Sequence, residues 1–340
     1  MKYRYLLIVG CAFAAASCGE REPAEENVEQ QSQLNQEPVV VYASYADETY
    51  LPALFAGYTR DTGVRVTVRH ADAQTIVDDV IGKRGSPPAD LLLTANVNGV
   101  WRAADEGALR PLGSDVAQQR VPAQLRDPDG YWTAVTFRTT QIIFDKQAFS
   151  AADVGRYEDL ANPEFKDKLC LTTSTLAVNR SLIAHLIKIH GTRPAEIIVR
   201  GWMQNLALPP FKSESELMRA IAAGTCSAGI VSSSGTQLLP PHDEVLRIVA
   251  STPAPAHVSV EAAGINRHAR EPEAARQLLE WMLSATAQQT HTSATATHQV
   301  IQSAAGQAEL WSQLLGGSNV AAAAWLDEDA VKLAERAGYR

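Results

Sequence analysis

Between residues 39 and 106, apolar residues form short runs and helical repeats. Residues 39–43 form a continuous apolar run, which is typical of a strand buried on both faces. Residues 51–62 have apolar side chains at helical spacing and stop at Gly63, and residues 64–68 alternate as a strand does. The same criteria predict helices at 73–83 and 97–106 and a buried strand at 89–94. This strand–helix alternation predicts an α/β fold with a doubly wound, mostly parallel sheet.

A second group of elements follows the apolar stretch at 131–146, which we expect to be a strand pair or a crossover strand. Strands are then predicted at 168–171, 227–231 and 257–265, and the last of these would return the chain to the first lobe. Helices are predicted at 179–190, 194–206, 213–223, 271–284 and 327–337. Roughly 300 residues exceed one ordinary hydrophobic core, so two lobes are expected. We assign residues 38–137 and 266–340 to an N-terminal lobe and residues 138–265 to a C-terminal lobe.

The N-terminus has the pattern of a lipoprotein export signal. Lys2 and Arg4 precede an apolar run that is too short to span a bilayer, and small residues then lead to Cys18. Residues 1–17 are therefore expected to be a signal peptide, with Cys18 lipidated after cleavage; an ordinary signal peptide with an incidental cysteine is the alternative. Residues 18–37 are polar, acidic and glutamine-rich, which predicts a flexible tether.

Charge and cysteine content narrow the classes of partner. A net charge of −8 without a basic cluster argues against a nucleic-acid partner. The lipid would be the only link to a bacterial membrane, with the protein in the periplasm. In that oxidising compartment Cys170 and Cys226 are expected to form a disulfide. A two-thiol metal site has less support, because no histidine lies close to either cysteine in sequence.

Several segments, in this order and spacing, resemble the ferric-ion-binding family of periplasmic ABC-transporter solute-binding proteins. They are residues 88–94, 121–132, 136–138, 157–163, 222–226 and 330–339. The resemblance implies a two-lobe periplasmic-binding-protein (clam-shell) fold, with doubly wound mixed sheets joined by crossover strands and a ligand in the cleft between the lobes. It also implies a monomer that hands a small ligand to an ABC permease and ATPase complex. No catalytic motif is found, so an enzyme is not expected.

The metal clamp of this family is missing. Such proteins hold Fe³⁺ with adjacent tyrosines in the second lobe, where this chain has serines at 232–234, and no tyrosine lies between Tyr157 and Tyr339. Fe³⁺ prefers phenolate and carboxylate ligands, which serine hydroxyls replace poorly. A second tyrosine-bearing motif of the family is replaced by a segment that ends at His298. Open alternatives for the ligand are Fe³⁺ with a synergistic anion, an iron chelate, or another anionic or polar solute. A non-transport sensor or protein-interaction lipoprotein on the same scaffold is the alternative function.

The resemblance also indicates candidate ligand-binding residues at strand ends and loops. They are Tyr42, Ser44, Tyr45, Asn96, Arg138, Thr173, Ser174, Thr175, Asn179, Ser232, Ser233 and Ser234, with Tyr42, Tyr45 and Asp47 as weak metal candidates. Local roles compete with ligand binding at several of these positions. Tyr42 can pack in the core, Asn96 can cap a helix, and the hydroxyl-rich loop at 172–175 can cap the helix that follows it.

Overall fold

The computed structural model describes residues 37–44, 50–82, 89–238, 248–251, 256–301, 314 and 319–340. The expected signal peptide, Cys18 and the tether up to residue 36 lie outside the described residues, as do the candidate ligands Tyr45 and Asp47. None of the helices within the described ranges is long and apolar enough to cross a membrane.

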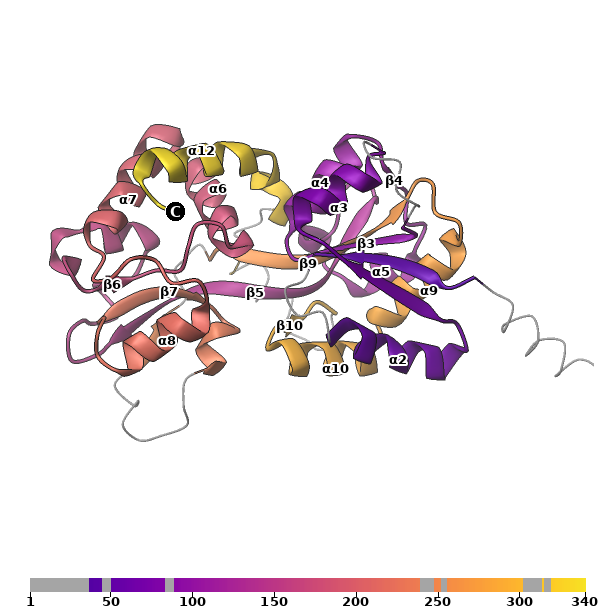
Figure 1. The fold of residues 1–340 in the computed structure, drawn as a ribbon, viewed down its shortest axis with the longest axis horizontal. Helices are drawn as coiled ribbons and strands as arrows, with labels where there is room; N and C mark the ends of the chain where they lie inside the picture. The colour runs from indigo at the N-terminus through magenta and orange to yellow at the C-terminus, as the bar shows by residue number, and fades with distance from the viewer. Residues whose placement is uncertain are drawn as a thin grey trace, which may run out of the picture. The chain divides into compact units, whose positions relative to one another are not determined.

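The first lobe is built on three parallel strands. β1 (Val39–Ala43) lies between β2 (Val66–His70) and β3 (Leu91–Thr94) and pairs in parallel with both. Helices α2 (Tyr50–Thr62), α3 (Ala73–Val80) and α4 (Val97–Asp105) connect or follow these strands (Figure 1). All these elements agree with the sequence prediction to within a few residues, because each has strong local periodicity.

A long strand then carries the chain out of the first lobe. β5 (Trp132–Asp145) is one continuous strand, so the crossover prediction for this stretch is confirmed and the strand-pair alternative is wrong. Along its first half β5 pairs with β9 (Val258–Asn266) and β10 (His298–Gln299), and along its second half with β7 (Ala228–Ser232) and β8 (Ile248–Ser251). Both lobes are therefore joined through the same strand (Figure 1).

The second lobe adds β6 (Leu169–Cys170), which is parallel to β7. Its helices are α6 (Ala177–His190), α7 (Thr192–Gln204) and α8 (Glu214–Ala222). The strand order through both lobes is β2-β1-β3-β9-β5-β7-β6, with β10 and β8 paired to β5 and the short β4 (Leu109–Arg110) paired to β9. The predicted mixed α/β architecture with crossover strands is confirmed.

The hydrophobic cores show how the remaining segments divide between the lobes. β9 contributes Val260 and Ile265 to the cores around β1 and β3, together with α9 (Pro272–Met282). The last helix, α12 (Asp327–Ala337), instead packs Leu333 and Ala334 against α6 and α7. β9 thus returns the chain to the first lobe, as predicted for 257–265. α12 lies in the range 266–340, which the sequence assigns to the N-terminal lobe, but it packs in the second lobe. Helical or strand periodicity identifies a buried face but not the sheet that covers it.

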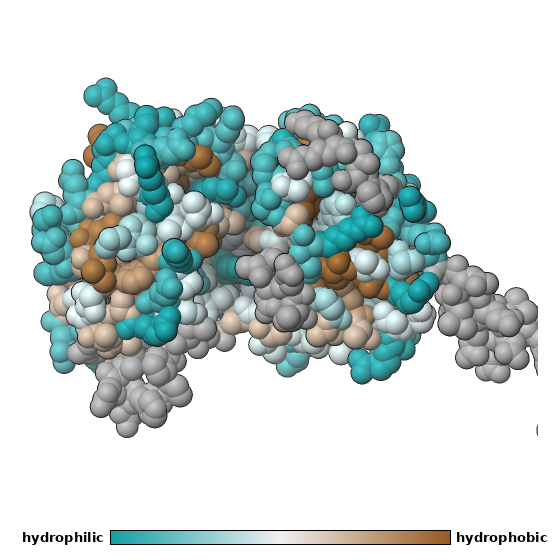
Figure 2. Space-filling model, viewed as in Figure 1, coloured by the Kyte–Doolittle hydropathy of each residue, from teal (hydrophilic) through white to brown (hydrophobic). Residues whose placement is uncertain are grey.

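A disulfide joins Cys170 at the end of β6 to Cys226 just before β7, with Cα atoms 5.9 Å apart, so the predicted pair is confirmed. Hydrophilic residues are spread over both lobes on the face seen in Figure 2, with apolar residues between them. The short helix α5 (Asp115–Arg120) was not predicted. The alanine-rich sequence around 284–306 is compatible with helix or loop, and its first part forms the helix α10 (Ala285–Thr295).

Candidate ligand-binding site

The two lobes meet along one edge of β5. β10 of the first lobe begins there, with His298 paired to Phe137, and β7 of the second lobe ends three residues further along β5, with Ser232 paired to Thr140. The Ser233 backbone N–H donates to the Thr139 carbonyl at 2.8 Å, and the Ser233 hydroxyl accepts from the Thr139 N–H at 3.2 Å. The same hydroxyl lies 3.0 Å from Nε2 of His298. Arg138 lies in β5 between these two contacts.

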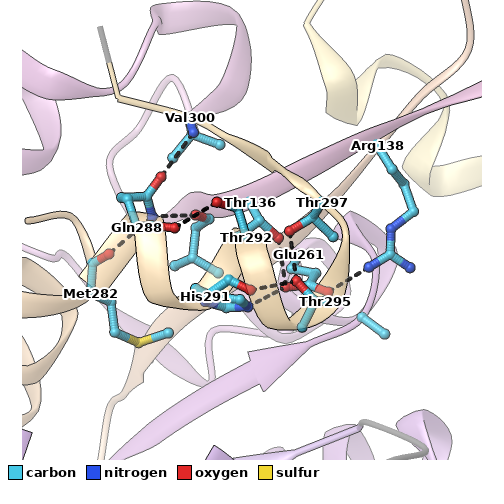
Figure 3. A network of polar contacts seen from close by, with 12 residues as sticks. Thr136, Arg138, Glu261, Met282, Gln288, His291, Thr292, Thr295, Thr297 and Val300 are labelled. Carbon is cyan, nitrogen blue, oxygen red and sulfur yellow. Dashed lines mark hydrogen bonds and ion pairs between the residues drawn. The ribbon is translucent and has the colours of Figure 1, made fainter. Parts of the chain in front are cut away.

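Arg138 is fixed by a buried carboxylate on the neighbouring strand. Its Nη2 donates to Oε1 of Glu261 at 2.6 Å, and its side chain stays 24% exposed while that of Glu261 is 2% exposed. The other carboxylate oxygen accepts from the Thr136 hydroxyl at 2.6 Å and lies 2.9 Å from Nε2 of His291 (Figure 3). One glutamate thus orients the arginine, while the free part of the guanidinium retains donors for a ligand.

The position of His291 depends on its own helix, α10. Gln288, one turn earlier and fully buried, donates from Nε2 to the carbonyls of Val135 and Met282 at 2.7 and 2.9 Å. Its Oε1 accepts from the Val300 N–H at 3.0 Å (Figure 3). These bonds tie α10 to β5 and to the segment after β10, so His291 is held against Glu261 by the first lobe's own packing.

Glu261 is ionised over the physiological pH range. Burial favours a raised pKa, but the hydrogen bond from His291 and the charge of Arg138 outweigh it and hold the pKa of Glu261 at about 2. The tyrosine ring of Tyr50 packs on His291 with centroids 5.3 Å apart, and burial followed by the nearby Glu261 charge raises the pKa of Tyr50. Burial, and then Arg138, lower the pKa of His298, so this imidazole is neutral near pH 7.

Ser232, Ser233 and Ser234 occupy the position where the family has its iron-binding tyrosines, and their hydroxyls have different partners. The backbone N–H and hydroxyl of Ser232 both donate to the carboxylate of Glu214, at 2.6 and 2.7 Å. Ser234 donates to the Ala296 carbonyl at 2.7 Å and so connects the lobes. Ser233, described above, contacts Thr139, the residue after Arg138, and His298. Ser232 and Ser234 therefore have structural partners that account for their hydroxyls.

The hydroxyl-rich loop before α6 is largely self-contained. Asn179 donates from Nδ2 to the Thr172 hydroxyl and to the Thr173 carbonyl, both at 2.8 Å. The Ser174 hydroxyl donates to the Tyr339 carbonyl at 2.9 Å, which ties the loop to the C-terminus. The hydroxyls of Thr173 and Thr175 lie 2.8 Å apart and are accessible to solvent. Of the four candidates here, Thr173 and Thr175 are the two that a ligand can reach.

In the first lobe, the described candidates bond to neighbouring elements. The Ser44 hydroxyl accepts from the Ala95 N–H at 3.0 Å, which links the ends of β1 and β3. Asn96 is the N-cap of α4. Tyr42 lies in the core, and its hydroxyl accepts from Nη1 of Arg69 at 3.2 Å. Over the described ranges, no three or more histidine, cysteine, aspartate or glutamate side chains gather as a metal site would require.

The sequence named Arg138 and Ser233 as ligand candidates, but it did not indicate Glu261, which pairs with Arg138, or the Glu261 partners His291 and Thr136. One feature of the sequence could have indicated Glu261. It is the one acidic residue in the strand 258–265, whose other residues are apolar or small. An unpaired charge in such a buried strand would be costly, so a partner could have been expected. His291 lies in an alanine- and threonine-rich helix with little hydrophobic pattern. Its pairing with Glu261 depends on tertiary structure.

A family model described as bacterial extracellular solute-binding protein matches residues 86–314, which is well over half of the chain. The protein belongs to this family. It is a solute-binding protein and not an enzyme. Iron uptake protein A1 of Synechocystis is 26% identical over 304 residues, covering 84% of this chain and 83% of the relative. Iron uptake protein A2 of the same organism is 30% identical over 235 residues, covering 66% and 68%.

Solved structures agree with the fold of this solute-binding protein. A Trichodesmium protein in complex with iron and citrate superposes with a TM-score of 0.76 at 26% identity, covering 89% of this chain and 100% of the other. A ferric binding protein from Campylobacter jejuni superposes with a TM-score of 0.78 at 22% identity, with the same coverage, and supports the fold alone. The predicted family is thereby confirmed.

Proposed function

We propose that this protein captures a solute between its two lobes and delivers it to an ABC permease and ATPase complex. Its family supports the solute-binding role, and the small residues ahead of Cys18 support attachment to a bacterial membrane by lipid, with the domain in the periplasm. Lobe closure around the ligand would present a surface to the permease, as in other hinged binding proteins. A single chain suffices for this role, so we propose a monomer.

The cargo we propose is ferric iron bound to a chelating anion such as citrate. Relatives are named as iron uptake or ferric-binding proteins, and one solved relative holds iron together with citrate. Bare Fe³⁺ is disfavoured because the serines at 232–234 supply no phenolate, and a chelator would fill those coordination positions instead.

One observation carries this proposal: a partly exposed arginine is fixed at the point where both lobes meet. Arg138 keeps N–H donors beyond the one that Glu261 uses, and an arginine fork suits a carboxylate. Thr173 and Thr175 add accessible hydroxyls near the N-terminus of α6, where an anion is stabilised by the helix dipole. We propose that these three residues contact the chelating anion.

The first test is elemental analysis and native mass spectrometry of the mature lipoprotein, purified in mild detergent without added metal. We expect iron and an organic acid in nearly equal amounts on the same protein. Stoichiometric iron without a chelator would contradict the proposed cargo. An organic anion without iron would also contradict it but retain the solute-binding role. If the protein carries neither and binds no ferric citrate in calorimetry, a sensor or protein-interaction role would replace transport.

A further inference from the structure

The positive charge of Arg138 is balanced by the protein itself. The positive charge of Arg138 is matched by the Glu261 carboxylate at 2.6 Å. A second carboxylate, that of Glu214, accepts from the backbone and the hydroxyl of Ser232, which pairs with Thr140 two residues along β5 from Arg138. His298, beside Ser233, adds no positive charge at neutral pH. The groups around this point therefore sum to no net positive charge.

Because the site has no net positive charge, the binding of a free polyanion is disfavoured. A tricarboxylate that reached Arg138 would meet a cation that is already paired with a carboxylate, and this carboxylate is almost fully buried and poorly screened by water or salt. The same tricarboxylate with Fe³⁺ bound has its charge cancelled by the metal. It can still accept hydrogen bonds from Arg138, without the repulsion.

We propose that Glu261 is a specificity-determining residue, which makes the site select the metal-loaded chelate over the free chelating anion. The inference rests on the proposed function and deepens it. Arg138 supplies hydrogen bonds in the right geometry, while Glu261 removes the net charge that would attract the empty chelator. Discrimination by a repulsive group, in addition to attraction of the right ligand, is a common route to specificity. Such selection would keep an importer from being occupied by cargo-free chelator.

The test compares ferric citrate and citrate as calorimetric ligands of the full-length protein and of Glu261→Gln. Glutamine keeps the shape and an oxygen acceptor for Arg138, but it removes the charge. We expect Glu261→Gln to bind free citrate about tenfold more tightly or better, as removal of one nearby charge should allow, with ferric citrate changed much less. Glu261→Asp, which retains the charge, should keep the wild-type preference.

Two controls separate this effect from general charge and from folding. Glu328→Gln removes a carboxylate that is 87% exposed on α12 and should leave both affinities unchanged. The wild-type protein alone also tests the inference, because it must bind ferric citrate at least about tenfold more tightly than citrate. Equal wild-type affinities, or an unchanged preference in a folded Glu261→Gln variant, would overturn the role of Glu261 while leaving the cargo intact. A wild-type protein that binds neither ligand would contradict the proposed cargo itself, and the inference with it.

Discussion

The hydroxyl of Tyr157 links β5 to the residue just before β9. It donates to the Thr140 carbonyl on β5 at 2.8 Å and accepts from the backbone N–H of His257, 100 residues later, at 3.1 Å. The His257 ring adds contacts of 2.8 Å to the Thr140 hydroxyl and 2.9 Å to the Ser181 hydroxyl. One buried phenol thus holds the start of β9 against β5 next to the proposed site.

Replacing Tyr157 with phenylalanine should therefore destabilise the protein without removing a ligand contact. Two buried backbone groups would lose their partner, which costs about 1–3 kcal/mol in the free energy of unfolding. Urea denaturation measures this loss. Tyr131→Phe, at a half-exposed tyrosine, is the control and should change stability by less than about 0.5 kcal/mol. Equal stability of Tyr157→Phe and wild type would show that water replaces the phenol at no cost.

The buried histidines of the second lobe should make the protein sensitive to mild acid. Burial lowers the pKa of His185 to about 4, with Glu158 opposing and His190 adding to the shift; burial and then His185 lower the pKa of His257 further below its usual value. The rings of His185 and His257 lie 5.4 Å apart. Both are therefore neutral in the folded protein at pH 7.

The direction of this pH dependence follows from the number of protons that the folded and unfolded chains bind. Between the unfolded pKa of about 6.5 and the folded values, the unfolded chain binds more protons, so stability falls as the pH falls. We expect urea-derived stability to be constant above about pH 7 and to drop by up to about 3 kcal/mol for His185 alone by pH 4. His185→Gln should flatten part of this slope. A stability that stays level from pH 7 to pH 4 would contradict the burial of these histidines.

Arg138→Ala should weaken the binding of ferric citrate by about tenfold to a hundredfold, because it removes the charged donor proposed to hold the chelator. The fold should survive, since Glu261 keeps the Thr136 hydroxyl and His291 as partners. Calorimetry gives the affinity and thermal unfolding checks the fold. Arg156→Ala, which removes a more exposed arginine that pairs with Asp159, should leave the affinity unchanged. A folded Arg138→Ala variant with wild-type affinity would remove Arg138 from the ligand site.

The sequence predicted elements that carry their own periodicity, such as β1 and α2, and it predicted the family from the order of its segments. It did not predict that α12 packs in the second lobe, since periodicity identifies the buried face of a helix but not the element that covers this face. The central ion pair was missed for a related reason. Arg138 and Glu261 are 123 residues apart, and the local sequence around either residue does not indicate that the other lies beside it. Only the pairing of β5 with β9 brings them together.

The disulfide gives a prediction that depends on no ligand. Cys170 and Cys226 are both almost fully buried, so the native protein should show no free thiol at either position until it is denatured and reduced. Replacing both by alanine should lower the free energy of unfolding by about 2–5 kcal/mol, because the unfolded chain regains the freedom that the crosslink removes. Urea denaturation of oxidised protein and of the double variant measures this difference.

The lipid anchor rests on the sequence alone and is tested on the full chain. Cys18→Ser should abolish cleavage at a lipobox and leave a precursor without acyl groups, whereas wild type should carry the mass of a diacylated Cys18 or its further acylated form. Mass spectrometry of membrane-extracted protein distinguishes the two. A matched change at Cys11, inside the expected signal peptide, should leave processing intact. Wild-type protein recovered without lipid and cleaved at another position would favour an ordinary signal peptide, and the solute-binding domain would then be free in the periplasm.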